Sequence, residues 1–126
     1  MRSVDWRQVN WLGVIVHGAY VWVFGLALAY FGRLLGLDTS REFVPLLTVA
    51  VALATVFAAY RLAMRAGDQP LMHGFLVGLL VAGTGLILTL LTASAGVPEI
   101  AGFLMQLLGG LLGGRMAQQV QQGSAR

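Results

Sequence analysis

Two histidines are the side chains of this sequence that could bind a cofactor or carry a proton. His17 lies six residues inside the first apolar stretch, and His73 lies two residues inside the third. An ionisable side chain within a membrane span is a functional hypothesis by default, because placing it in hydrocarbon is costly. The sequence therefore singles out these two positions, of which His17 is the deeper.

Three interpretations of His17 stay open: a neutral imidazole bonded to a neighbouring helix, an axial ligand to haem or a chlorophyll-type pigment, and a proton-transfer group. Tyr20, Trp22 and Phe24 are close in sequence and could pack against a macrocycle. His73 is expected at the membrane interface, where its ring reaches water and headgroups. Its alternatives are a proton-linked role and a metal or haem ligand.

Gln106 is the one Asn, Gln or charged residue well inside an apolar stretch. An unpaired amide in hydrocarbon costs several kcal/mol, so this side chain is expected to face another helix. Such an interhelical hydrogen bond contributes ~0.6–2 kcal/mol. The alternative is a contact with a pore or a substrate.

Reactive clusters are missing from the sequence. No Asp, Glu, Lys or Arg lies in the cores of the apolar stretches, which argues against ion-coupled carriers and pumps, since these keep paired charges at mid-membrane. There is no HExxH pattern, phosphate-binding glycine loop or serine–histidine arrangement, and there is no cysteine. We therefore predict no catalytic residue, no enzyme activity, no metal site and no bound cofactor.

The composition indicates that lipid surrounds the chain. Of its 126 residues, 58% are hydrophobic and 10% are charged, whereas a soluble domain carries roughly 25% charged residues. The net charge of +3 is too small and too dispersed for nucleic-acid binding. A water-soluble helical bundle is the alternative, and it would have too few charges to cover its surface.

Four apolar stretches are long enough to be membrane spans, since a spanning helix needs ~20 largely apolar residues. They are 11–31, 44–60, 71–93 and 97–114, with a polar tail over 115–126. Gly67 is expected to end the second helix, and Thr39 with Glu42 has the spacing of a capping box that would start it. Short connections predict an all-α membrane protein of four transmembrane helices in an antiparallel up-down bundle.

Arginine positions predict the orientation in the membrane. Six arginines flank one side of the predicted spans and two flank the other, which places both termini in the cytoplasm by the positive-inside rule. The six are Arg2, Arg7, Arg61, Arg65, Arg115 and Arg126, and the two are Arg33 and Arg41. The predicted location is a bacterial inner membrane.

Small residues form stripes at helical spacing on the predicted spans. In lipid no hydrophobic force joins helices, so close backbone approach and small polar side chains drive their association. The residues expected to pack helices in this way are Gly74, Gly78 and Gly85 in the third span and Gly102, Gln106, Gly109 and Gly113 in the fourth. The stripes favour a compact bundle or an obligate oligomer.

The stretch 58–80, AAYRLAMRAGDQPLMHGFLVGLL, resembles small bacterial four-span membrane proteins of the YrzE type, a family of unknown function. The matching residues are Ala58, Ala59, Arg61, Arg65, Gly67, His73, Gly74 and Gly78, with Gly109, Gly110, Gly113 and Gly114 in the last span. The aromatic first span and the lack of lysine depart from the family pattern. The resemblance implies the fold and topology, and it implies no particular activity.

The function expected from these features is that of a non-enzymatic structural, accessory or interaction subunit of a membrane assembly or homo-oligomer. Two alternatives stay open. One is a cofactor-binding subunit that uses His17 to hold haem or a pigment. The other is a small channel lined by glycine, threonine and Gln106.

Overall fold

The computed structural model describes residues 4–91 and 97–125, and for 97–99 it describes the backbone alone. Its elements are η1 (Trp6–Gln8), α1 (Trp11–Leu34), η2 (Leu37–Thr39), α2 (Phe43–Ala66), α3 (Pro70–Leu91) and α4 (Val97–Ser124). Within the described ranges the fold is entirely helical. Each of α1 to α4 is long and apolar enough to cross a membrane, which is the makeup of a multi-pass membrane protein.

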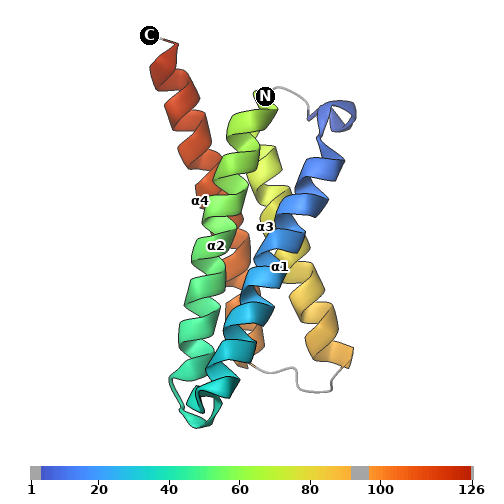
Figure 1. Ribbon diagram of the computed structural model, residues 1–126. Coiled ribbons are helices and arrows are strands. Elements are labelled where there is room, and N and C mark those ends of the chain that lie inside the picture. Colours follow the sequence, from blue (N-terminus) through green and yellow to red (C-terminus); the bar gives the residue numbers. More distant parts are fainter. Residues whose placement is uncertain (1–3, 92–96, 126) are drawn as a thin grey trace.

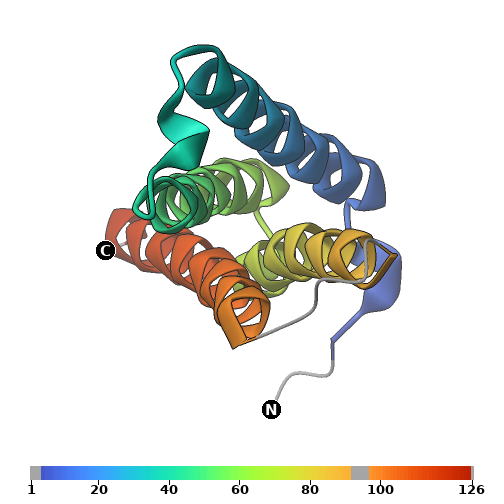
Figure 2. The ribbon, with the colours of Figure 1, turned by 90° about the horizontal axis from the view of Figure 1, so that it is seen from below.

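The helices α2 and α3 lie between α1 and α4 (Figures 1 and 2). Both α1 and α4 pack against this middle pair, and within the described residues no Cα of α1 comes within 8 Å of a Cα of α4. The start of α1 and the end of α4 lie at the same end of the molecule (Figure 1). The buried apolar core includes Val14, Val21, Ala59, Leu62, Val77 and Val81.

The end of α2 agrees with the prediction from the sequence, and the predicted capping at its beginning does not. Gly67 comes directly after α2 with a φ of 69°, so this glycine ends the helix as predicted. The predicted capping box is wrong, because the Thr39 hydroxyl donates back to the Gly36 carbonyl at 3.0 Å across the η2 turn. Glu42 makes no side-chain hydrogen bond to the first turn of α2.

Two helices continue well past the apolar stretches that predict them. α2 runs on from residue 60 to Ala66, and α4 runs through the expected polar tail to Ser124. Packing accounts for the extension of α4, because Ala117 is fully buried and the Gln121 side chain donates to the Ala63 carbonyl at 3.2 Å. Residues 92–93 of the third expected span lie outside the described residues.

Candidate functional site

Glycines bring the backbones of α3 and α4 together. A Cβ added at Gly78 would lie 2.8 Å from the Gln106 carbonyl oxygen and 3.0 Å from the Gly110 Cα. A Cβ added at Gly74 would lie 2.6 Å from the Gly114 Cα. Such distances are shorter than real Cβ contacts, so neither position has room for a side chain unless a helix moves.

A second set of glycines on α4 faces α2. A Cβ added at Gly109 would lie 3.0 Å from the Ala52 carbonyl oxygen, and one at Gly113 would lie 2.8 Å from the Ala59 Cβ. Successive residues of a helix point ~100° apart. Each adjacent glycine pair of α4 therefore serves both neighbours, one residue toward α2 and the next toward α3.

The other two predicted packing glycines have looser surroundings. A Cβ at Gly85 would lie 3.6 Å from the Trp22 ring, and one at Gly102 would lie 3.7 Å from the Thr48 Cγ2. These are ordinary van der Waals distances. Gly85 and Gly102 thus lie at helix contacts without being required there for space.

The side chain of Gln106 on α4 contacts α2, and 8% of the residue is exposed. Its Oε1 is 2.7 Å from the hydroxyl of the fully buried Thr55, whose single hydrogen is shared between this oxygen and the Val51 carbonyl at 2.9 Å. The amide oxygen therefore has the interhelical partner that burial in hydrocarbon demands.

Gln106 also lines a cavity of about 690 Å³ that borders all four helices. Trp22 lines this cavity too, and its Nε1 is buried without a hydrogen-bond partner. The channel hypothesis stays a prediction.

His73 is buried, with 1% of the residue exposed, so the expectation that its ring reaches water is wrong. Its Nδ1 lies 3.0 Å from the Gln69 carbonyl, and its Nε2 accepts from the Asn10 backbone N–H at 3.0 Å. A carbonyl only accepts and an N–H only donates, so the ring is neutral with its proton on Nδ1. Neither nitrogen then keeps a lone pair for a metal or haem. Asn10, the residue before α1, contacts this ring, and no pattern in the sequence predicts that contact.

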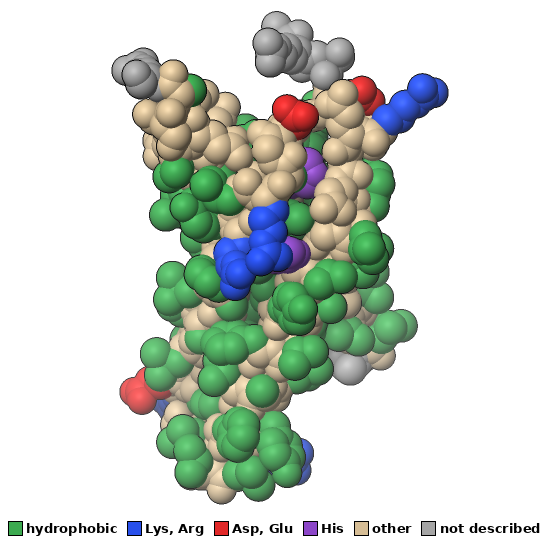
Figure 3. Space-filling view, turned by 45° about the horizontal axis from the view of Figure 1, so that its top comes forward, with side chains coloured by type: hydrophobic (Ala, Val, Ile, Leu, Met, Phe, Trp, Pro, Cys, Tyr) green, Lys and Arg blue, Asp and Glu red, His purple; other side chains and the backbone are tan. Residues whose placement is uncertain are grey.

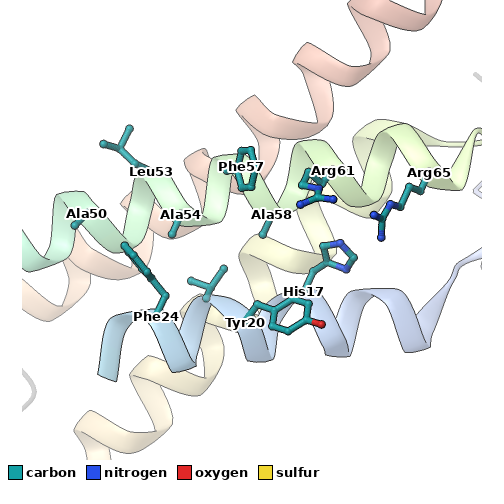
Figure 4. A pocket seen from close by; sticks show the side chains of 11 residues that line it. His17, Tyr20, Phe24, Ala50, Leu53, Ala54, Phe57, Ala58, Arg61 and Arg65 are labelled. Carbon is teal, nitrogen blue, oxygen red and sulfur yellow. The ribbon is translucent and has the colours of Figure 1, made fainter. Parts of the chain in front are cut away.

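His17 has a different hydrogen-bond environment. Its Nδ1 lies 2.8 Å from the Gly13 carbonyl one turn earlier on α1, so Nδ1 carries a proton, and in the neutral ring Nε2 has a lone pair. The bond is within its own helix, not to a neighbouring helix as expected. Only 9% of the residue is exposed, yet it lines a groove between α1 and α2 (Figure 4).

This α1–α2 groove has a volume of about 790 Å³. Its floor is buried and includes His17, Val21 and Ala58. Its walls are exposed aromatic and aliphatic side chains from both helices: Tyr20, Phe24, Leu53 and Phe57. Trp22 lies in the other cavity, so it does not join Tyr20 and Phe24 around His17.

Arg61 and Arg65 form one end of the groove, and both reach from α2 toward α1 in Figure 4. The Arg61 guanidinium lies 5.7 Å from the Phe57 ring centroid. In space-filling view a patch of arginine side chains adjoins a histidine above a hydrophobic surface (Figure 3). From the sequence these arginines are expected to set the orientation alone, and their spacing within α2 does not indicate that they line the same groove as His17.

Within the described residues no group of three or more His, Cys, Asp or Glu side chains is placed to hold a metal ion. Comparison with protein-family models, with curated proteins and with solved structures finds no match. The YrzE-type resemblance and the haem or pigment hypothesis for His17 stay predictions.

Proposed function

We propose that the chain is a non-enzymatic accessory or interaction subunit of a membrane assembly, either with other subunits or with copies of itself. The observation that carries the proposal is that buried polar side chains form hydrogen bonds within the chain. Thr55, His73 and Gln106 all form hydrogen bonds that tie separate parts of the chain together. Because these buried polar side chains bond within the chain, the surface that contacts other molecules is the apolar outer one.

Apolar side chains on the outer helices support the same proposal. Large exposed hydrophobic residues lie along α1 and α4, and they include Leu12, Ile15, Val23, Leu104, Leu108 and Leu112. These two helices pack only against the middle pair. Their free faces fit the acyl chains of lipids and equally the helices of a partner.

The expected result of mild extraction is a complex. After affinity purification from native membranes, native mass spectrometry should show the chain bound to a stoichiometric partner or to further copies of itself. An unrelated tagged four-span protein at the same expression level serves as the control for detergent artefacts. Recovery of the bare monomer alone, across several mild detergents, would contradict the proposal.

The proposed arrangement is an antiparallel up-down bundle in a bacterial inner membrane, with both termini in the cytoplasm. The arginine count supports the orientation, because six of eight flank one side of the spans. Green fluorescent protein fused after residue 126 should fluoresce, and alkaline phosphatase fused there should be inactive. Fusions made after Asp38 should behave in the opposite way. An active phosphatase at residue 126 contradicts this orientation.

A further inference from the structure

We propose that the α1–α2 groove binds one anionic phospholipid whose headgroup carries a free hydroxyl, as phosphatidylglycerol does. Arg61 and Arg65 hold the phosphate, His17 accepts a hydrogen bond from the headgroup hydroxyl, and an acyl chain lies along the apolar part of the groove. This site is separate from the accessory role, and it stands or fails on its own.

The charge distribution in the groove selects an anion. Two guanidiniums lie at one end, and the groove is lined by no carboxylate from the described residues. Guanidinium donors bind phosphate oxygens through paired hydrogen bonds. The ring of Phe57 beside Arg61 restricts the guanidinium at the groove mouth, which lowers the entropy lost on binding.

The apolar part of the groove matches one leaflet of a bilayer. Arg61 and Ala50 are eleven residues apart on α2, or ~16 Å at ~1.5 Å per residue. Half of a ~30 Å hydrocarbon core is ~15 Å. The segment from Arg61 to Ala50 therefore matches the acyl-chain region below a phosphate held by Arg61 and Arg65, and the small side chains of Ala54 and Ala58 leave space for the chain.

His17 narrows the choice of headgroup. Nδ1–H donates to Gly13, so in the neutral ring Nε2 is an acceptor, which repels a bare phosphate oxygen and accepts a hydrogen bond from a hydroxyl. A choline headgroup has no such donor, and it adds a cation beside two arginines. A glycerol headgroup supplies the hydroxyl and leaves the phosphate as the single charge.

The test uses the full chain, delipidated in detergent and then given defined lipids with matched acyl chains. Native mass spectrometry should show one phosphatidylglycerol bound per chain, in preference to phosphatidylcholine. The Arg61→Gln, Arg65→Gln double variant should reduce this preference about tenfold or more. The matched control is the Arg33→Gln, Arg41→Gln double variant, at two arginines outside the groove, and it should keep the preference. Millimolar inorganic phosphate should not displace the lipid.

Two further variants separate the parts of the site. His17→Leu should lower the preference for phosphatidylglycerol over phosphatidylethanol, which lacks the hydroxyl, by about fivefold. Ala54→Phe keeps both arginines but fills the groove, and it should reduce lipid retention even if the arginine variant fails to fold. Circular dichroism checks the helix content of every variant.

Three outcomes overturn the proposal. The first is equal retention of phosphatidylglycerol and phosphatidylcholine by the unmodified chain. The second is an Arg33→Gln, Arg41→Gln variant that loses as much preference as the Arg61→Gln, Arg65→Gln variant, since that would reflect net charge alone. The third is a visible absorption band in the purified protein that disappears in His17→Leu, which would assign the groove to haem or a pigment.

Discussion

A Gly74→Ala substitution is expected to force α3 and α4 apart and to lower the free energy of unfolding by about 3 kcal/mol. The added methyl group would meet the Gly110 carbonyl oxygen, and it would lie 2.6 Å from the Gly114 Cα and 2.7 Å from the Gly114 nitrogen. All three atoms belong to the backbone, which has no rotamer to change. We therefore expect a cost at the upper end of the range for overpacking.

Gly83→Ala is the matched control, because Gly83 lies on the same helix and no atom lies within 4 Å of its added Cβ. Alanine favours a helix over glycine by up to about 1 kcal/mol, so this variant should be as stable as the unmodified chain or more so. Unfolding by sodium dodecyl sulfate from mild detergent micelles, followed by circular dichroism, measures both. Equal stability of the two variants would mean that the α3–α4 glycine contact is not required.

The second large effect is expected at His73, which joins α3 to the residue that caps α1. Asn10 donates its backbone N–H to the His73 Nε2 at 3.0 Å, and its side-chain oxygen accepts from the Gly13 N–H at 2.8 Å. His73→Phe fills the space but removes the acceptor. Asn10 is exposed and this hydrogen bond is part-buried, so we expect a loss of about 1 kcal/mol, at the lower end for a donor left without a partner, and faster hydrogen exchange at the Asn10 amide.

His73→Gln supplies the control for this result, because its side-chain oxygen is able to take the place of Nε2 as acceptor. It should restore much of the stability and slow the exchange at Asn10 again. If the Phe variant matches the unmodified chain in both measurements, the hydrogen bond does not hold the start of α1 in place.

Hydrophobicity and length predicted the four helices, because both are local properties of the sequence. Gly67 marked the end of α2 for the same reason, since a left-handed residue is a local requirement. The polar segment after Gly114 was expected to be a tail, yet Ala117 is fully buried and Gln121 donates to a carbonyl of α2. Here tertiary contacts extend α4 beyond the point that its local composition predicts.

The sequence could not identify which helices meet. Helical periodicity placed Gly109 and Gly113 in one stripe of α4, but it does not say that α2 is their partner, nor that Gly110 and Gly114 meet α3. Rotation of a helix about its axis is settled by packing, which joins residues far apart in sequence.

The sequence predicts the α1 side of the candidate site but not the α2 side. His17, Tyr20 and Phe24 fall on one face of α1 by spacing, and they do line one groove. The arginines of α2 complete that groove from more than forty residues away, where no local pattern connects them to His17. The sequence likewise does not predict that the two histidines differ in hydrogen bonding, because Asn10 and His73 are 63 residues apart.

The packing of α4 against both α2 and α3 has a consequence for biosynthesis. The ribosome releases α4 after the other three helices, so until then Gly74 and Gly78 face acyl chains instead of a helix. An α4 that arrives from another nascent chain presents the same glycines to that vacant surface. Exchange of the last helix between two copies would thus create a dimer without any contact that the monomer lacks.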